Sequence, residues 1–214
     1  MVTIVRSRQQ FGAITTPQQR SPDDEARRVR VLARAEAFTR PLGPLTTERL
    51  QAGIPVPAGQ VSLIAPDPVQ WGAFDSGDAQ INTRILEAIA DGQQGLVALY
   101  GLTRGDTRLA GLTLHAGHQR ADPSILDQVD GQTSVPTLII PVIAVHRGHQ
   151  RQGVGRQVID VVISVARARA PYLGITTLSL ASTPDSDGFF SALGFERDDV
   201  AAPDGTRARW LLLQ

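Results

Sequence analysis

The residues best placed to do chemistry lie in a glycine-bearing turn that follows a strongly apolar segment. Residues 138–145 are almost continuously apolar, and the run Gln150-Arg-Gln-Gly-Val-Gly-Arg156 begins five residues later. Valines at positions 158, 161, 162 and 165 then recur at helical spacing. This order of strand, turn and helix predicts an anion site, because the first turn of a helix exposes unpaired N–H groups and carries a partial positive charge.

Two common phosphate-binding motifs do not fit this turn. A P-loop places lysine and then serine or threonine after its second glycine, whereas Val154 and Gly155 follow Gly153. A Rossmann fingerprint places glycine or alanine at its sixth position, where Val158 stands, and an acid about 20 residues further on. The turn therefore matches neither the P-loop nor the Rossmann fingerprint.

The turn resembles the Gln/Arg-x-x-Gly-x-Gly/Ala loop of the GNAT family of acyl-CoA N-acyltransferases. Val145-His146-Arg147 resembles the valine-x-proline end of the family's fourth strand, with arginine in place of proline. Residues 174–182 alternate as the family's fifth strand does, and Gly188-Phe-Phe-Ser-Ala-Leu-Gly-Phe195 resembles its phenylalanine-tyrosine-x-x-leucine-glycine-phenylalanine helix end. The resemblance covers about residues 60–214. It implies an α/β (α+β) fold, with a mixed, mostly antiparallel central sheet whose fourth and fifth strands splay, flanked by helices.

The resemblance also implies a site for acetyl-CoA, bound as a cosubstrate. Backbone groups of Ile143 and Val145 would pair with the pantetheine arm, the loop would wrap the pyrophosphate, and Arg151 or Arg156 could add charge. Thr183 stands where the family often has asparagine, although it is equally well explained as a helix N-cap. The implied cofactor-binding residues are Ile143, Val145, Gln150, Arg151, Gln152, Gly153, Val154, Gly155, Arg156, Thr183 and Phe190, and no metal is implied.

Phe190 is a departure from the family pattern. It occupies the position where many members have the tyrosine that protonates the leaving thiolate, and a phenyl ring has no proton to donate. A thiolate with a pKa near about 8.5 is nevertheless a fair leaving group. Residues 138–145 contain no acid, and His146, Tyr100 and Tyr172 are expected to be structural. The catalytic residues are therefore left unassigned.

Two absences narrow the chemistry further. The chain has no cysteine, and all 21 of its basic residues are arginine, which excludes thiolate nucleophiles, cysteine-based zinc sites and lysine Schiff bases. The leading hypothesis is an N-acetyltransferase in which a primary amine of a small molecule or a protein attacks acetyl-CoA directly in a ternary complex. One alternative is a degenerate coenzyme A-binding or regulatory protein without turnover, and another is an interaction module led by residues 1–59.

Charge and hydropathy give expectations about partners and location. The 21 acidic residues balance the 21 arginines, and we expect no nucleic-acid partner because such partners usually require a basic excess. No apolar run approaches the ~18 residues of a membrane span, and the start of the chain does not read as a signal peptide. We therefore expect an amine acceptor, no membrane partner and a cytoplasmic location, and leave a homodimer open.

The pattern of elements divides the chain into an N-terminal extension, residues 1–59, and a domain, residues 60–214. A basic amphipathic helix is predicted at about residues 22–38 of the extension. In the domain we predict a strand at 61–65, and a helix capped by Asp78 that carries Ile81, Ile85, Leu86 and Ile89 on its inner face and ends at Gly92.

Four further segments complete the predicted domain. Residues 96–102 and 109–115 predict a hairpin, and the polar stretch 116–135 predicts a loop. Residues 138–145 predict a strand that is buried on both faces. Pro141 lies inside this strand and marks a bulge or a place where the sheet opens, because proline cannot donate to a ladder.

Overall fold

The structure is a computed structural model that describes Ala26 and residues 52–64, 71, 73–129, 131–203 and 205–213. The helix predicted at about 22–38 lies outside these residues, apart from Ala26. The division at residues 59 and 60 stays a prediction. The described sheet begins with β1 (Ile54–Val56), which pairs with β2 (Gly59–Ile64).

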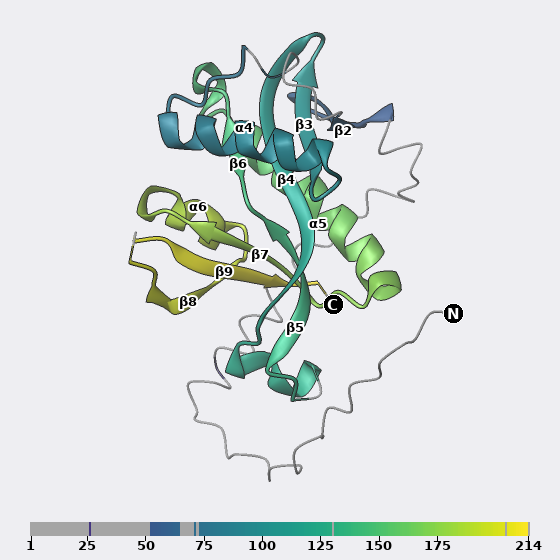
Figure 1. Ribbon diagram of the computed structural model, residues 1–214, viewed down its shortest axis with the longest axis vertical. Coiled ribbons are helices and arrows are strands. Elements are labelled where there is room, and N and C mark those ends of the chain that lie inside the picture. Colours follow the sequence, from purple (N-terminus) through teal and green to yellow (C-terminus); the bar gives the residue numbers. More distant parts are fainter. Residues whose placement is uncertain are drawn as a thin grey trace, which may run out of the picture.

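One mixed sheet organises the described residues (Figure 1). Its strands pair in the order β1-β2-β3-β4-β5-β7-β9-β8, and β6 pairs with β4 beside β5. Every pairing is antiparallel except that of β5 with β7. The remaining strands are β3 (Ala98–Arg104), β4 (Thr107–Arg120), β5 (Ser134–Ile140), β6 (Ile143–Val145), β7 (Thr177–Ser182), β8 (Glu196–Ala201) and β9 (Arg207–Leu212). The predicted fold class is confirmed.

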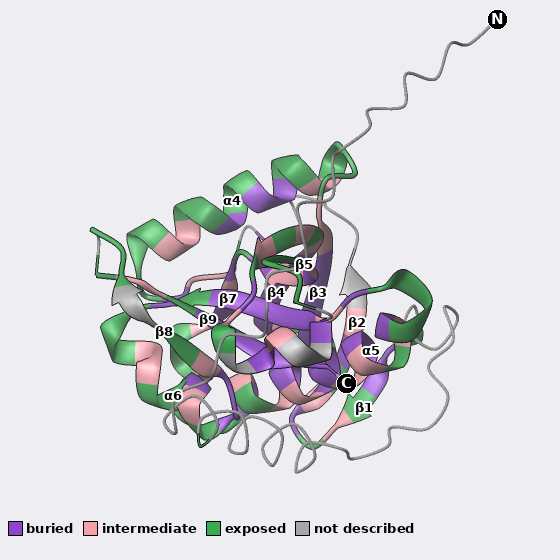
Figure 2. Ribbon diagram, turned by 90° about the horizontal axis from the view of Figure 1, so that it is seen from below, coloured by how far each residue is buried: buried purple, intermediate pink, exposed green. Residues whose placement is uncertain are grey.

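Helices cover both faces of this sheet (Figure 2). One face carries α4 (Ala79–Gln93), and the other carries α5 (Val154–Leu173) and α6 (Asp187–Ala192). Asp78 caps α4 by accepting from the backbone N–H groups of Gln80 and Ile81, as the sequence predicts. Short 3-10 helices occupy Pro123–Val129 (η1), Arg147–His149 (η2) and Pro184–Ser186 (η3).

The core follows the same layers. The largest cluster joins one face of the sheet to the valines of α5 and to Phe190 and Phe195 near α6. A second cluster lies under α4, where Trp71 packs with Ile85 and Val142. Because β3 presents alternate residues to the two clusters, it is apolar throughout its middle rather than alternating.

Two expectations about these elements are wrong. Residues 116–135 do not form a loop, because β4 continues to Arg120, η1 follows and β5 starts at Ser134. The outer halves of β4 and β5 form a ribbon in which polar residues are only partly covered, so they lack the apolar alternation that reveals a strand. Leu86 is 59% exposed rather than on the inner face of α4, because the sheet contacts only the narrow face that includes Ile85 and Ile89.

The predicted opening of the sheet lies at Pro141. The apolar run 138–145 is interrupted there, so that β5 ends at Ile140 and β6 begins at Ile143. The run is not buried on both faces as expected, since Leu138, Ile143 and Val145 are only half-buried. For Ile143 and Val145 the physical reason is that a pocket lies beside them, where a neighbouring strand would otherwise cover them.

The close approach of Trp71 to β4 gives a test of this packing. Gly111 lies under the Trp71 ring, and a Cβ atom added to it would overlap that ring. Trp71 is only 4% exposed and cannot easily move. We expect Gly111→Ala to lower the free energy of unfolding by about 1–3 kcal/mol, measured by urea denaturation.

Gly188→Ala is the matched control, because a Cβ atom there meets nothing within 4 Å. Alanine is also the better helix former, so this variant should be neutral or more stable by up to about 1 kcal/mol. Equal stability of Gly111→Ala and the unsubstituted protein would show that the Trp71 ring is not packed as described.

Candidate functional site

A pocket of about 740 Å³ lies where the sheet parts. β6 pairs with β4, β7 pairs with β5 and β9, and no described residues of β6 and β7 pair with each other. The pocket is lined by residues of β6 and β7, by α4 on one face of the sheet, and by the start of α5 and by α6 on the other. The gap therefore connects the two faces.

The structure brings together all but one of the residues expected to bind the cofactor. The exception is Gln152, whose side chain donates to the Gly148 carbonyl at 3.1 Å outside the pocket lining. The residues that line the pocket as expected are Ile143, Val145, Gln150, Arg151, Gly153, Val154, Gly155, Arg156, Thr183 and Phe190. Their binding of a cofactor stays a prediction.

The glycine turn has the backbone geometry of an anion site. Arg151 has φ +58°, the one positive value for a non-glycine residue in the described ranges, and Gly153 has φ +76°. Left-handed residues in such a turn gather successive N–H groups into a concave surface. Because α5 begins at Val154, its first amides have no helical acceptor and point toward the same end of the pocket. Strain at Arg151 is typical of a functional turn.

Gly155 lies where two side chains leave little room for a larger residue. A Cβ atom at this position would lie 3.3 Å from Cγ2 of Val145 and 3.6 Å from the ring of Phe189. The first turn of α5 therefore lies close to both β6 and α6, and all three elements line the pocket. A larger residue at 155 would fill the space in front of the exposed amides.

Phe190 belongs to the core as well as to the pocket. It is 3% exposed, and its ring centroid lies 5.0 Å from that of Phe189 and 5.8 Å from that of Phe195. The two tyrosines do not replace the missing phenol. Tyr100 is buried in the core, where desolvation raises the pKa of its phenol, and Tyr172 is 84% exposed at the end of α5. Neither lines the pocket.

Thr183 and His146 have local partners. The hydroxyl oxygen of Ser186 accepts from the Thr183 backbone N–H at 3.0 Å and lies 3.0 Å from the Thr183 hydroxyl, so Thr183 starts η3 as an N-cap. His146 accepts from the Gly148 N–H at 3.2 Å through Nδ1, and its ring lies against Phe74. These contacts fit the structural role expected for His146.

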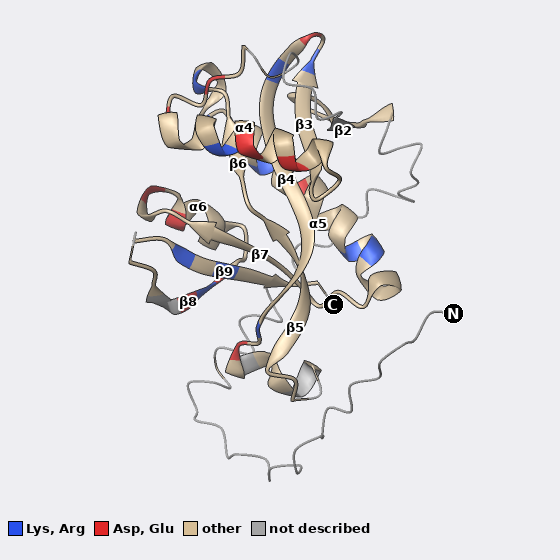
Figure 3. Ribbon diagram, in the orientation of Figure 1, with Lys and Arg blue, Asp and Glu red and all other residues tan. Residues whose placement is uncertain are grey.

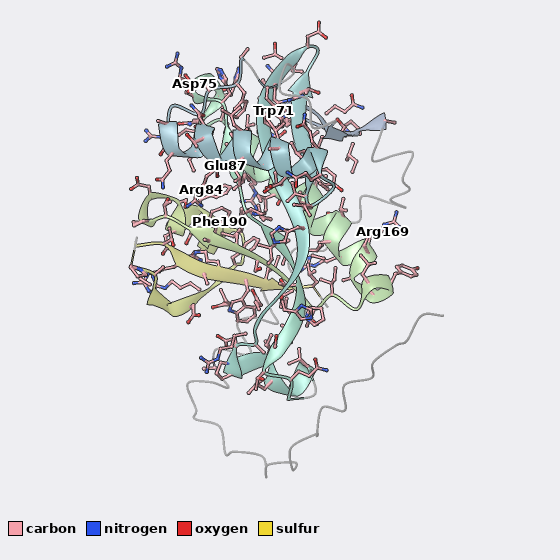
Figure 4. The ribbon with its side chains drawn as sticks, in the orientation of Figure 1. Trp71, Asp75, Arg84, Glu87, Arg169 and Phe190 are labelled. Atoms are coloured by element: carbon pink, nitrogen blue, oxygen red, sulfur yellow. The ribbon has the colours of Figure 1, made fainter. Side chains whose placement is uncertain are left out.

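The charged side chains around the pocket are mostly arginines. Arg84, Arg151 and Arg156 line it together with one acid, Asp185. Figure 4 shows Arg84 on α4 and Phe190 on α6, which reach the pocket from opposite faces of the sheet. Away from the pocket, arginines and acids are distributed over several elements (Figure 3). Arg84 was not identified from the sequence, because its position in an amphipathic helix carries no local signal.

An ion pair between a buried arginine and a half-buried aspartate holds α6 against the sheet. Arg209 of β9 is 1% exposed and donates through Nε to Oδ1 of Asp187 at 3.0 Å and to the Ser182 hydroxyl at 2.9 Å. Its Nη1 donates to the Phe195 carbonyl at 3.0 Å. The network joins β7, β9 and α6 behind the pocket. The sequence held one signal for it, an arginine within the apolar end of β9.

The hydrogen bond from Arg209 outweighs the opposing effect of burial and holds the pKa of Asp187 below its ordinary value, and hydrogen bonds from Ser182 and Arg197 lower it further. In the described ranges, no three His, Cys, Asp or Glu side chains gather as a metal site requires. A search of the same residues finds no helix with the length and hydropathy to cross a membrane.

Comparisons with known proteins agree with the architecture. Residues 124–195 match the Acetyltransferase (GNAT) family. A bacterial toxin structure is similar with a TM-score of 0.63 at 16% identity, over 72% of this chain and 90% of its own. A tyrosine-to-phenylalanine mutant of KacT gives 0.61 at 22% identity, over 72% and 94%. No curated protein sequence matches the chain significantly. At these identities, the structures show a shared fold.

The expectation of no nucleic-acid partner is wrong. AtaT complexed with acetyl-methionyl-tRNAfMet has the same fold, with a TM-score of 0.59 at 19% identity over 69% of this chain and 92% of its own. Another similar structure is the AtaT-AtaR complex bound to DNA. A zero net charge therefore does not exclude nucleic acid for this fold, because the total says nothing about where the charges lie.

The ion pair behind the pocket predicts a specific pH dependence of stability. Because the folded-state pKa of Asp187 is lowered, its contribution is complete above the unfolded value, about 3.9, and is lost as the pH falls through the folded value. We expect Asp187→Asn to be destabilised relative to the unsubstituted protein at pH 7, and the difference to shrink at about pH 3. Urea denaturation at both pH values measures it.

Asp185→Asn is the control for this comparison, since Asp185 is exposed and two residues away. It should leave the stability within about 0.5 kcal/mol at pH 7. A difference for Asp187→Asn that is equal at the two pH values would mean that the carboxylate charge does not hold α6.

Proposed function

We propose that this chain, of which residues 124–195 match the Acetyltransferase (GNAT) family, transfers the acetyl group of acetyl-CoA to a primary amine. The observation that carries the proposal is the pocket between the parted strands, which ends at the left-handed turn and at the exposed amides of α5. A long cofactor with a pyrophosphate at one end and a thioester at the other fits a slot with an anion site at one end. AtaT, which has the same fold, has been solved with acetyl-CoA.

In this proposal each part of the pocket has a task. The backbone of Ile143 and Val145 pairs with the pantetheine arm, and the turn 150–155 surrounds the pyrophosphate through its amides. Arg151 and Arg156 add positive charge beside it. Thr183 and Phe190 border the arm from the side of β7 and α6. The chain has no lysine, so that only backbone dipoles and arginines are available to neutralise the phosphates.

The transfer then takes place by direct attack. A neutral amine adds to the thioester carbonyl, the oxyanion is held by backbone amides where β5 and β6 part, and the thiolate leaves. No cysteine exists to carry the acetyl group, which leaves a ternary complex as the simplest route. Phe190 cannot protonate the thiolate, and among the described residues the pocket lining contains no histidine or tyrosine and one carboxylate, Asp185. In this proposal solvent carries the two proton transfers.

The arginines point to the class of acceptor. With Arg84 on α4 and a single acid, Asp185, in the lining, the pocket suits an amine whose carrier is anionic better than a polyamine. The molecule in complex with AtaT, acetyl-methionyl-tRNAfMet, is an acetylated amine on such a carrier. We therefore include aminoacyl-tRNA among the acceptors to be tested. The second candidate function, coenzyme A binding without turnover, is favoured by Phe190.

Ligand-induced stabilisation tests the cofactor assignment. At 100 times its dissociation constant, a ligand adds about 2.7 kcal/mol of stability, which corresponds to a rise in Tm of roughly 5–10 °C for a protein of this size. We expect acetyl-CoA to produce such a shift. Gly155→Val should reduce it, because the added side chain meets Val145 and Phe189 in front of the amides. Absence of any shift would rule out the cofactor.

Release of free coenzyme A thiol separates the two functions. The unsubstituted protein should release thiol with at least one acceptor from a panel of small amines, peptides and aminoacyl-tRNAs. A thermal shift without thiol release from any of them would support the non-catalytic function.

Phe190, which stands where many members of the family have tyrosine, leads to a prediction of increased activity. A tyrosine at position 190 would place a proton donor beside the leaving thiolate, and general acid catalysis contributes about 10²–10⁴-fold when it is well placed. We expect Phe190→Tyr to raise kcat by at least about tenfold at neutral pH. Phe189→Tyr is the control, since its ring is more exposed and adjacent. An unchanged kcat in Phe190→Tyr would show that protonation of the thiolate does not limit the rate.

A further inference from the structure

The side chain of Gln150 is held by two backbone carbonyl groups. Its Nε2 donates to the Ser76 carbonyl at 2.7 Å and to the Val145 carbonyl at 3.2 Å. A glutamine amide nitrogen has two hydrogens, and these two backbone acceptors use both. Neither hydrogen is left for a pyrophosphate oxygen. The residue that begins the turn is therefore bound to the segment just before α4, which lies 74 residues earlier in the chain.

Arg147 makes a second connection between the same two segments. Its backbone N–H donates to the Asp75 carbonyl at 2.8 Å, and its Nε lies 3.2 Å from Oδ2 of Asp75. Gly77 has φ +81°, and a Cβ atom there would lie 3.3 Å from Cβ of Arg147. Contacts of backbone, amide and charge thus join residues 75–77 to residues 147–150. We call this set of contacts the clasp.

The first half of the clasp is firmly attached to α4. Asp75 accepts through Oδ1 from Nδ2 of Asn82 at 3.0 Å and from the Gly77 N–H at 2.7 Å. Oδ1 of Asn82 in turn accepts from the Ser76 N–H at 2.9 Å. These bonds, and then the charge of Arg147, hold the pKa of Asp75 below its ordinary value, so that it is ionised at neutral pH. Residues 75–78 are therefore joined to the first turn of α4 by side-chain hydrogen bonds.

The position of α4 matters because it forms one wall of the pocket. Gln80, Ile81 and Arg84 line the pocket from this helix, within two turns of the clasp. Figure 4 shows Asp75 at the start of α4 and Arg84 further along it. A shift of the start of the helix therefore moves the wall that lies across the sheet from α6.

We propose that Gln150 is a positioning residue that fixes α4 against the turn 150–155. The same contacts would then hold both the turn that binds the cofactor and the α4 wall, which faces the acceptor. The proposal rests on the proposed function for its kinetic consequences, but its structural content concerns the chain without ligand. This role differs from that of a residue that binds the pyrophosphate, whose loss would weaken only the binding of the cofactor. Loss of the Gln150 side chain should therefore disturb the wall of the pocket formed by α4, even when the acetyl donor has no pyrophosphate.

Hydrogen–deuterium exchange tests the clasp without any ligand. In Gln150→Ala, amides in the first two turns of α4 should exchange about 3- to 10-fold faster than in the unsubstituted protein, the factor expected for losing one hydrogen bond. Gln152→Ala is the matched control, because its amide contacts only Gly148 within the turn. Gln150→Arg should restore slow exchange, since a guanidinium can also donate to two carbonyls. Unchanged exchange in Gln150→Ala would overturn the proposal.

Kinetics with two donors then separate positioning from phosphate binding. Acetyl-CoA is compared with S-acetyl-pantetheine, which has the thioester and the arm but lacks the pyrophosphate. We expect Gln150→Ala to raise the KM of the acceptor about 3- to 10-fold with both donors, because the lost hydrogen bond supports α4 in both cases. A loss confined to acetyl-CoA, with the acceptor KM unchanged, would make Gln150 a pyrophosphate ligand and contradict the proposal.

The two proposals fail in different ways. If the protein neither binds acetyl-CoA nor releases thiol, the proposed function is wrong, while faster exchange of α4 in Gln150→Ala would still support the clasp. If the protein is active but Gln150→Ala has the exchange and acceptor KM of the unsubstituted protein, the clasp is wrong and the proposed function stands.

Discussion

The parting of the sheet at Pro141 is the constraint on which the site depends. Proline has no N–H group and cannot continue a ladder, and the chain resumes as β6 two residues later. β4 bridges the interruption, because it pairs with β5 through one half and with β6 through the other, and the Thr113 N–H donates to the Val142 carbonyl between them. β6 therefore stays with β4 while β7 stays with β5, and a gap opens without leaving the sheet unsupported.

The gap gives access from both faces, which determines how a two-substrate reaction would be arranged. α5 and α6 provide an anion site and an apolar wall on one face, and α4 provides a polar wall on the other. Two substrates that enter from opposite faces meet at the level of the sheet without displacing each other. The ion pair between the buried Arg209 and Asp187 fixes α6 on one side, and the clasp joins the start of α4 to the turn on the other. Each wall is thus held by polar contacts between elements that are far apart in the chain.

Sequence alone predicted the parts of this arrangement that are local. The opening of the sheet at Pro141, the turn with Gly153 and the cap at Asp78 each depend on residues within a few positions of one another, and all appear in the structure. The outer ribbon of β4 and β5 was missed, because its polar residues are paired by contacts outside the segment. The clasp was missed for the same reason, since Gln150 and Ser76 lie far apart in the chain. Long-range pairing of ordinary polar residues leaves no local pattern.

The charge balance misled the prediction of partners because net charge is a sum over the chain, whereas binding depends on local fields. The 21 acids cancel the 21 arginines in the total, yet three arginines and one acid line the pocket. The anion site adds positive potential that appears in no charge count, since it comes from backbone N–H groups at the start of α5. If the proposed function is right, the chain binds phosphates without a net positive charge and without lysine, because backbone amides and planar guanidinium groups can supply the donors that phosphate oxygens require.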